Sequence, residues 1–472
     1  MRDDLSGPDS VAAAAKGMFA GRRLKVLLVS YWFPPANAIG AIRVGHFARS
    51  LYEAGHDIRV LTAQGWEDQS LPLALPADRV TYVRAPPGGA LLDPLVRPFL
   101  KLARRFGAAA RPRVPDRDVS ALRPRASDQT VPAVPPLSGS VGMVLRNHYY
   151  CLVQFPDAYA SWTRPATAAA HRLVKHWRPD IILASAPPNS VLIAARRIAR
   201  MCGAPWIADL RDLWSDNSYY GYPLWRLWLD RLHERFVLRS AAGLVTVSPI
   251  WADILRGKYR QPVACVLNGF VSEDFPAAPT APGPGDVVSI CHTGTIYAGY
   301  RDPTPLFRAI ALLSVTERRH VAVHFFGLSE RDTPVVRTAA AAAGVSDRIF
   351  LHARVPYRES LSLQQSADIL LLLHWNNIRD AGMIPAKFFE YLRAGRPILF
   401  IGYEHGDVAQ IIRERDVGVI ANDPPVIAEQ LRRWIEQRPA GIPAVRPAAR
   451  EGMSRDDQYR KFEQFLAQLI LR

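Results

Sequence analysis

The sequence predicts an α/β protein made of two doubly wound domains, each a parallel sheet with helices on both faces. Short apolar runs of strand length alternate with amphipathic stretches of helix length from residue 23 onwards, which is typical of parallel sheets. The alternation stops once, in a Pro-, Ala- and Gly-rich stretch at 271–285, and then resumes. A chain of 472 residues with 49% apolar and 22% charged residues is long enough for two such domains.

The elements of the first half begin with a buried-type strand that stops at a Pro pair, followed by an amphipathic helix that ends near Gly55. The further strands are predicted at 58–62, 180–185, 205–210 and 243–248, and the further helices at 164–177, 190–203 and 224–239. A Pro- and Arg-rich stretch at about 86–136 lacks clear periodicity and is interpreted as an insertion.

The second half repeats the alternation and ends in one more helix. Its strands are predicted at 287–294, 321–327, 349–353, 369–374 and 397–402. Its helices are predicted at 303–314, 333–343, 359–367, from Pro385 onwards, at 424–436 and at 456–471.

The predicted organisation has five parts. They are a tail at 1–22, an N-terminal Rossmann-like domain at 23–270, a linker at 271–285, a C-terminal Rossmann-like domain at 286–440, and a helical end at 453–472 that packs back on the N-terminal domain. Ligands of such sheets bind at the carboxyl ends of the strands, so we expect a site in a cleft between the two domains.

The composition favours a cytoplasmic protein. No apolar run approaches the ~18 residues of a transmembrane helix, and the acidic, polar first residues make a poor secretory signal. The four cysteines are scattered without C-x-x-C spacing, so they predict reduced thiols rather than a zinc site or a disulfide framework.

The net charge of +16 predicts a polyanionic partner. Residues 95–125 include nine basic residues and only two acidic ones. This basic segment has almost no interleaved aromatic residues for base stacking, so a nucleic-acid partner is not expected.

The stretch "GMIPAKFFEYLRAGRPILF" predicts a nucleotide diphosphate site. Pro385 is expected as the first helical residue, and the loop from Gly382 to Ile384 would present free amides and the positive helix end to an anion. Lys387 adds a charge one turn in, and Glu390 on the same face could accept both hydroxyls of a ribose. The alternative is an ordinary solvated ion pair between Lys387 and Glu390.

A second stretch, "HTGTIYAGYRDPTPLFRAI", runs from a strand end through a glycine-rich loop into a helix. Gly294, Thr295 and Gly299 would let backbone amides approach phosphate oxygens, and Arg301 could bind them bidentately. The spacing fits neither a dinucleotide fingerprint nor a P-loop. A plain turn between a strand and a helix is the alternative.

The strand ends of the N-terminal domain carry a third set of polar residues. Candidate catalytic residues are Asp209, Arg211 and Asp212, whose burial is costly unless each charge has a partner or a ligand. A purely structural Asp/Arg network is the alternative. Gly40, Arg43, Asn189 and Trp214 lie on the same strand ends, the last three being candidate acceptor-binding residues.

Together, the motifs "FPP…G…R", "ADLRD.W", "VSP", "LNGF…F", "TGT" and "G.IP.K.FEYL..G.P" resemble those of the retaining glycosyltransferases of family 4, which have the GT-B fold. The resemblance runs from Arg23 to about Ile435 and excludes the insertion. It implies a nucleotide-sugar substrate, such as a UDP- or GDP-sugar, bound mainly by the C-terminal domain. It also implies an acceptor held mainly by the N-terminal domain, and neither a metal nor another cofactor.

By this resemblance, Glu390 matches the family's ribose-binding glutamate, Arg301 and Lys387 its diphosphate-binding cations, and Gly40 the glycine of a loop over the donor phosphates. The chain departs from the family at Gly382, where relatives commonly carry an acid that touches the donor sugar. Asp380 is the nearest acid and a candidate replacement. The "DLRD" cluster stands where many relatives have a His.

The resulting functional prediction is a glycosyltransferase of polysaccharide biosynthesis that retains the anomeric configuration. The alternative is a nucleotide-sugar epimerase of the same fold, which would need acid/base residues in the cleft and no acceptor. The resemblance further implies a glycan or polyprenyl-diphosphate-linked acceptor at the inner face of an anionic membrane. The mixed apolar and basic residues of 91–113 suit peripheral binding there. Pro94 and Pro98 instead favour a disordered, solvated insertion.

Overall fold

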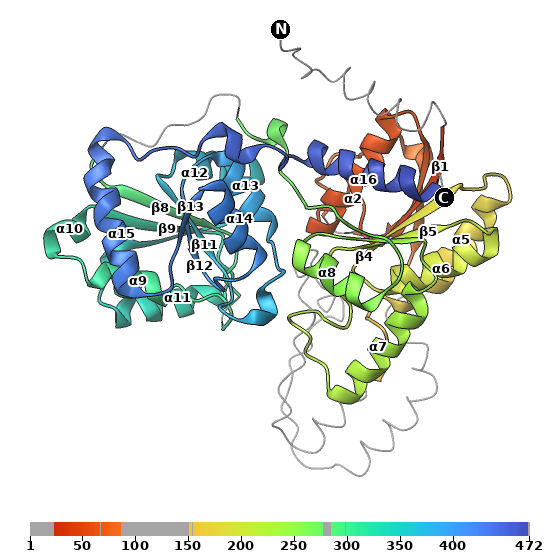
Figure 1. Ribbon diagram of the computed structural model, residues 1–472, viewed down its shortest axis with the longest axis horizontal. Coiled ribbons are helices and arrows are strands. Elements are labelled where there is room, and N and C mark those ends of the chain that lie inside the picture. The colour runs from red at the N-terminus through yellow and green to blue at the C-terminus, as the bar shows by residue number, and fades with distance from the viewer. Residues whose placement is uncertain are drawn as a thin grey trace, which may run out of the picture. The chain divides into compact units, whose positions relative to one another are not determined.

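The computed structural model describes residues 23–66, 68–85, 151–152, 154–276, 285–297 and 299–470. Its chain divides into two compact units (Figure 1). The first unit takes in residues up to Val247, then Ala252–Cys265 and Tyr459–Arg472, and the second takes in Ser248–Trp251 and Val266–Gln458. The predicted fold class, two parallel-sheet α/β domains, is confirmed. The basic segment at 95–125 and the predicted insertion at about 86–136 lie outside the described residues.

The N-terminal domain contains a seven-stranded sheet of order β3-β2-β1-β4-β5-β6-β7, in which all recorded pairings are parallel. Its strands are β1 (Lys25–Ser30), β2 (Asp57–Gln64), β3 (Val80–Arg84), β4 (Ile181–Ala186), β5 (Trp206–Leu210), β6 (Gly243–Thr246) and β7 (Val263–Cys265). Its helices are α2 (Ile39–Glu53), α5 (Thr163–Val174), α6 (Ser190–Cys202), α7 (Leu224–Leu238) and α8 (Pro249–Lys258).

Helix α16 (Arg455–Ile470) packs on this N-terminal sheet beside α2. The rings of Phe47 and Phe462 lie 4.7 Å apart between centroids, and the Tyr459 hydroxyl donates to the Phe47 carbonyl over 2.7 Å. Further along α16, Phe465 contacts β6 at Gly243, where a larger residue would collide with its ring. The last helix of the described chain therefore completes the core that α2 begins.

The C-terminal domain contains a six-stranded parallel sheet of order β10-β9-β8-β11-β12-β13. Its strands are β8 (Val288–Thr293), β9 (Val321–Phe326), β10 (Ile349–His352), β11 (Ile369–Leu373), β12 (Ile398–Ile401) and β13 (Gly418–Ile420). Its helices are α9 (Thr304–Ala311), α10 (Val315–Arg319), α11 (Asp332–Ala342), α12 (Tyr357–Ser366), α13 (Ala386–Ala394), α14 (Asp407–Arg415) and α15 (Pro424–Gln437).

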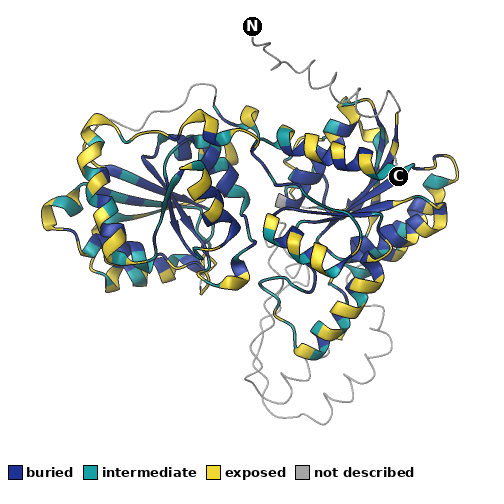
Figure 2. Cartoon of the chain, viewed as in Figure 1, coloured by how far each residue is buried: buried dark blue, intermediate teal, exposed yellow. Residues whose placement is uncertain are grey.

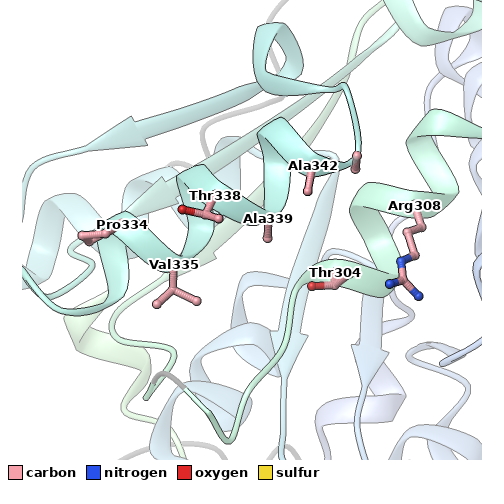
Figure 3. A pocket seen from close by; sticks show the side chains of 8 residues that line it. Thr304, Arg308, Pro334, Val335, Thr338, Ala339 and Ala342 are labelled. Atoms are coloured by element: carbon pink, nitrogen blue, oxygen red, sulfur yellow. The ribbon is translucent and has the colours of Figure 1, made fainter.

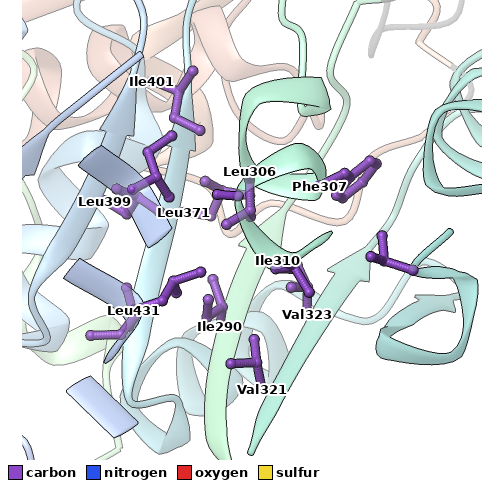
Figure 4. Packing of buried hydrophobic residues seen from close by; sticks show 14 of the residues in the cluster. Ile290, Leu306, Phe307, Ile310, Val321, Val323, Leu371, Leu399, Ile401 and Leu431 are labelled. Atoms are coloured by element: carbon purple, nitrogen blue, oxygen red, sulfur yellow. The ribbon is translucent and has the colours of Figure 1, made fainter. Parts of the chain in front are cut away.

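A shallow groove of about 520 Å³ separates α9 from α11 (Figure 3). Beneath these helices, the apolar sides of α9 and α15 meet one face of the sheet in a close-packed core, with Leu306 and Leu431 fully buried (Figure 4). Burial of this kind contributes about 25 cal/mol per Å² of apolar surface. The central strands β11 and β12 are buried at every position, and buried residues are dark blue in Figure 2.

Six elements were not predicted from the periodicity: β3, β7, β13, α8, α10 and α14. The three strands among them, β3, β7 and β13, are edge strands, and β7 and β13 have only three residues each. A strand this short is stabilised by pairing with its neighbour rather than by its own hydrophobic pattern.

None of the described helices is both long and apolar enough to cross a membrane. No disulfide links the cysteines of the described residues, and Cys151, Cys202 and Cys291 are buried.

Candidate functional site

A glycine turn follows β8 and brings the backbone close to α13. Gly294 has φ +89°, a conformation that L side chains rarely adopt, and a Cβ there would lie 3.2 Å from the Lys387 Nζ. Its amide donates to the Phe326 carbonyl over 2.8 Å, which anchors the turn to β9. Thr295 follows, half-buried, and Gly299 also has a positive φ, +92°.

Arg301 lies at the end of this turn with only 7% of its surface exposed. Its guanidinium carbon is 4.6 Å from the centroid of the Tyr297 ring, and its buried Nε has no hydrogen-bond partner. Within the described part of the chain, no carboxylate oxygen lies within 4.0 Å of its guanidinium nitrogens. A buried guanidinium without a counter-charge is costly, so this position suits an anionic ligand.

Lys387 lies in the first turn of α13, half-buried, and points back toward the end of β8. Its Nζ donates to the Thr293 carbonyl over 2.5 Å and is 3.4 Å from the Nε2 of His292. Burial, and after it the neighbouring Arg301, lowers the pKa of Lys387 to about 7. Arg301 and Lys387 therefore repel each other, the carboxylates of Glu390 and Asp332 offset this repulsion only in part, and a diphosphate would relieve it further.

His292 positions the lysine. Its ring is fully buried and its Nδ1 lies 2.9 Å from the Leu371 carbonyl. A carbonyl can only accept, so we assign the proton to Nδ1, which leaves the Nε2 lone pair facing Lys387. Burial, together with Lys387, lowers the pKa of His292 well below its ordinary value, so the ring stays neutral.

The start of α13 differs by one residue from the prediction. Pro385 has φ −71° and ψ 148° and is the N-cap, and the helix begins at Ala386. The prediction of Pro385 as the first helical residue was therefore wrong, because proline fixes φ but leaves ψ free to be extended. The buried loop residues Gly382 and Ile384 precede it, and no described acceptor lies within hydrogen-bonding distance of their amides.

Glu390 lies one turn further along α13. Its Oε2 accepts from the Nε2 of Gln364 over 3.1 Å, and it forms no ion pair with Lys387 within 4.0 Å in the described chain. Burial raises the pKa of Glu390. The geometry thus differs from the alternative of a solvated ion pair and leaves the other carboxylate oxygen for a ligand.

Asp380 is held by a histidine. Its Oδ2 lies 2.9 Å from the Nδ1 of His374 and accepts from the Trp375 amide over 3.3 Å, and both side chains are almost fully buried. The Nε2 of His374 and the Oδ1 of Asp380 have no partner. Burial is the main cause of the lowered pKa of His374.

Gly382 has no room for a side chain. A Cβ at this position would overlap the indole ring of Trp251, whose residue groups with the C-terminal unit. An acidic side chain could not be accommodated here without moving that ring.

In the N-terminal domain, Asp209 and Arg43 are brought together. The Arg43 Nη2 donates to the Asp209 Oδ1 over 3.0 Å, and the Ser185 hydroxyl donates to the Oδ2 over 2.7 Å. All three side chains are buried. Asp209 therefore has the full set of partners that a buried carboxylate needs.

Arg211 lies at the end of β5, beneath the first turn of α2. It donates from Nε to the Ala186 carbonyl over 3.1 Å and from Nη2 to the Pro187 carbonyl over 2.5 Å. A Cβ on Gly40, the second residue of α2, would overlap this guanidinium. Burial lowers the pKa of Arg211 to about 10 and raises that of the half-buried Asp212.

The other two predicted residues are Asn189 and Trp214. Asn189 is half-buried at the N-cap of α6, with no side-chain capping bond. Trp214 is buried, and its Nε1 donates to the Asp230 Oδ1 in α7 over 3.3 Å. Its indole N–H is already used within the domain.

Sequence reasoning missed His292, His374 and Gln364. His292 is a polar residue inside an otherwise apolar strand, and His374 directly follows the apolar β11, so both carried a signal at strand ends. Gln364 carried none, because its contact with Glu390 depends on how two helices pack. In the ranges that the structure describes, no cluster of His, Cys, Asp and Glu is arranged to hold a metal ion. The groove between α9 and α11 contains none of the predicted site residues.

Comparison with known proteins bears on both domains. Residues 40–269 match the model of the glycosyl transferase 4-like domain family. No curated protein sequence matches the chain.

Solved structures match nearly the whole chain at low sequence identity. A sucrose-phosphate synthase from Thermosynechococcus elongatus matches with a TM-score of 0.60 and 12% identity, over 95% of this chain and 100% of that one. A glycosyltransferase from Rickettsia africae matches with a TM-score of 0.56 and 12% identity, over 96% and 99%. HepE from Anabaena, solved in complex with UDP, matches with a TM-score of 0.58 and 12% identity, over 94% and 100%.

The likeness to these structures shows the fold, and the family model covers the N-terminal domain. The chain therefore has the two-domain GT-B fold, and its residues 40–269 match the glycosyl transferase 4-like domain family.

Proposed function

We propose that this protein is a glycosyltransferase that moves a sugar from a nucleotide diphosphate to an acceptor. The observation that carries the proposal is the pair of cations, Arg301 and Lys387, at a glycine turn and a helix N-terminus, with no described carboxylate oxygen within 4.0 Å of either. Structures of similar fold include one solved with UDP-glucose, which supports a nucleotide sugar as the donor.

In this proposal the C-terminal domain binds the donor. Arg301, Lys387 and the free amides before α13 contact the diphosphate, with Gly294 and Thr295 lining the turn, and Glu390 accepts the ribose hydroxyls. As the bond between the sugar and the diphosphate breaks, negative charge builds on the leaving phosphate. Cations already in place stabilise that charge without reorganising, so the protein's own side chains supply the electrostatic catalysis and no metal is required.

The N-terminal domain is proposed to bind the acceptor. Asp212 is the candidate for a proton-transfer role, since burial raises its pKa and no described side chain bonds to it. Asp209, Arg43 and Arg211 would hold that strand end in shape, and Asn189 would contact the acceptor. Asp380, paired with His374, is proposed to help place the donor sugar.

We further propose retention of the anomeric configuration, a glycan or polyprenyl-diphosphate-linked acceptor, and a cytoplasmic location at the inner face of an anionic membrane. Retention rests on the resemblance to family 4. Membrane association rests on the net charge of +16 and on the mixed apolar and basic residues at 91–113.

The test is a thermal-shift screen of UDP- and GDP-sugars, followed by turnover. A ligand present at 100 times its Kd should add ~2.7 kcal/mol to the stability of the folded state. Donor consumption that requires an acceptor would support transfer, whereas consumption without any acceptor would indicate an epimerase or a hydrolase. An NMR coupling constant of the product that showed inversion would contradict the retaining mechanism.

A further inference from the structure

Helix α7 buries charged residues and exposes a row of large apolar ones. A surface helix normally buries its apolar stripe, yet α7 buries Arg226, Asp230 and Glu234, all at most 2% exposed. Four of its large apolar side chains instead face outward, with exposed fractions of 82% for Leu224, 62% for Trp228, 48% for Leu232 and 45% for Phe236. Val237 and Leu238, at the end of the helix, are buried. Figure 2 shows yellow, exposed residues along this helix.

Hydrogen bonds of the buried charges fix this orientation. The Arg226 Nε donates to the Asp230 Oδ2 over 2.8 Å, and this carboxyl also accepts from the Tyr220 hydroxyl over 2.7 Å. Glu234 accepts from the Ser215 amide, the Lys258 Nζ and the Tyr259 hydroxyl, at 2.9, 2.8 and 2.7 Å. Rotating α7 to hide its exposed apolar row would leave these charges without partners, which is strongly unfavourable for buried ions.

The exposed apolar residues are spaced four apart, so they form one row on the helix surface. Three exposed arginines, Arg231, Arg235 and Arg239, repeat at the same spacing and lie along that row. The acids of α7 both point inward, so this outward side carries no negative charge. We define the outer face of α7 as the four apolar residues with these three arginines.

Further positive charge lies beside the outer face. Arg197 and Arg200 of α6 are exposed, and the guanidinium of Arg196 is 3.9 Å from the centroid of the Phe236 ring. Burial, and then the charges of Arg200, Arg239 and Arg197, lowers the pKa of Arg196. These cations repel one another, so an anionic surface would be attracted to them.

We propose that the outer face of α7 docks on an anionic lipid bilayer. The proposal rests on the membrane association proposed above and assigns it to described residues outside the basic segment at 95–125. Leu224, Trp228, Leu232 and Phe236 enter the boundary between headgroups and acyl chains, and the arginines pair with lipid phosphates. An anionic bilayer is apolar inside and negatively charged at its surface. It therefore complements the outer face of α7, which has large apolar residues, arginines and no acidic residue.

Co-sedimentation with vesicles tests the proposal. Full-length protein is mixed with vesicles of 30% phosphatidylglycerol in phosphatidylcholine, or of phosphatidylcholine alone, at ~0.15 M salt. Three variants are compared with the unaltered chain. The apolar variant carries Trp228→Ser and Leu232→Ser, and the arginine variant carries Arg231→Gln, Arg235→Gln and Arg239→Gln. The third variant lacks residues 91–125. The matched control is Leu312→Ser with Val315→Ser, two exposed apolar residues of the C-terminal domain with exposed fractions of 52% and 70%.

The apolar variant should lose at least tenfold in affinity for the anionic vesicles. The arginine variant should lose about 100-fold, because each basic residue near such a surface contributes about fivefold. The control should bind like the unaltered chain. Nucleoside diphosphate binding should be the same in all of them, so a failure of the membrane proposal can be told apart from a failure of the donor site.

Two results would overturn the proposal. The first is that both α7 variants bind anionic vesicles as tightly as the unaltered chain, whether or not the deletion variant binds them. The second is loss of self-association or of binding to another protein, with vesicle affinity unchanged, which would make the outer face of α7 a protein interface instead.

Discussion

Nucleotide binding should weaken as the pH rises above 7, because Lys387 loses its proton in the free protein. Burial and Arg301 lower its pKa from 10.5 to about 7 in the free protein, and a bound diphosphate would raise it again. Above pH 7 the free lysine has lost its proton and must regain one to bind. The Kd for a nucleoside diphosphate should therefore rise with pH, from pH 7 upward.

The size of this effect follows from the fraction of charged lysine. With a pKa of about 7, half of the free protein carries the charge at pH 7 and about 1% at pH 9. The affinity should fall about 50-fold across this window, or ~2.3 kcal/mol. The ligand's terminal phosphate has a pKa of about 6 and stays ionised throughout, so it does not produce the trend.

Titration calorimetry with UDP and GDP between pH 7 and 9 measures the effect. Lys387→Arg keeps its charge at all these pH values and should give a flat profile, while Lys387→Met should bind weakly at each pH. A Kd of the unaltered protein that does not change across the window, for whichever nucleotide binds, would refute the reasoning that Lys387 titrates on binding.

The same lysine should lower the stability of the free protein. Between pH 7 and 10.5 the unfolded chain binds more protons than the folded one, so stability should rise with pH across this range. The fall in pKa corresponds to ~4.8 kcal/mol at 1.36 kcal/mol per pKa unit. Partial exposure of Lys387 screens it, and we expect Lys387→Met to stabilise the free protein by about 1–3 kcal/mol at pH 7, as denaturant unfolding would show.

Three other predictions concern the carboxylate and two glycines. Glu390→Ala should weaken nucleoside diphosphate binding by roughly 1.5–3 kcal/mol and leave pyrophosphate binding unchanged, and an equal loss for both ligands would contradict the ribose contact. Gly40→Ala should displace Arg211 and cost about 1–2 kcal/mol of stability, a cost that should disappear in an Arg211→Ala background. Gly382→Ala should cost about 1–3 kcal/mol and less in a Trp251→Ala background, whereas additive losses would show that the indole does not limit this position.

The sequence predicted the inner elements of both sheets because those strands are continuous apolar runs. Strand β11, for example, is Ile369–Leu373 in the structure and is apolar at every position. The edge strand β13 has three residues and half-buried side chains, so its local pattern resembles that of a loop. Such a strand exists because β12 offers it hydrogen-bonding partners.

The places of the candidate site residues in the fold were predictable, and their hydrogen-bonding partners were less so. Polar residues at the ends of apolar strands indicated the turn with Arg301 and the start of α13. Which side chains pair is a matter of long-range packing: Arg43 and Asp209 are 166 residues apart in the chain. Trp214 was expected to contact an acceptor, but its indole N–H donates to Asp230 of α7. The hydrophobic pattern of α7 did not predict that this helix would bury Asp230.

The contact of α16 with α2 imposes an order on folding during synthesis. Tyr459 and Phe47 are 412 residues apart, and a ribosome adding about 5–20 residues per second needs roughly 20–80 s to cover that distance. The C-terminal sheet, whose strands all lie between these residues, has emerged in full by then and can fold first. Until α16 has been synthesised, the apolar side of α2, including Phe47, lacks its covering helix and could be bound by chaperones. The N-terminal domain is completed only when α16 packs on it.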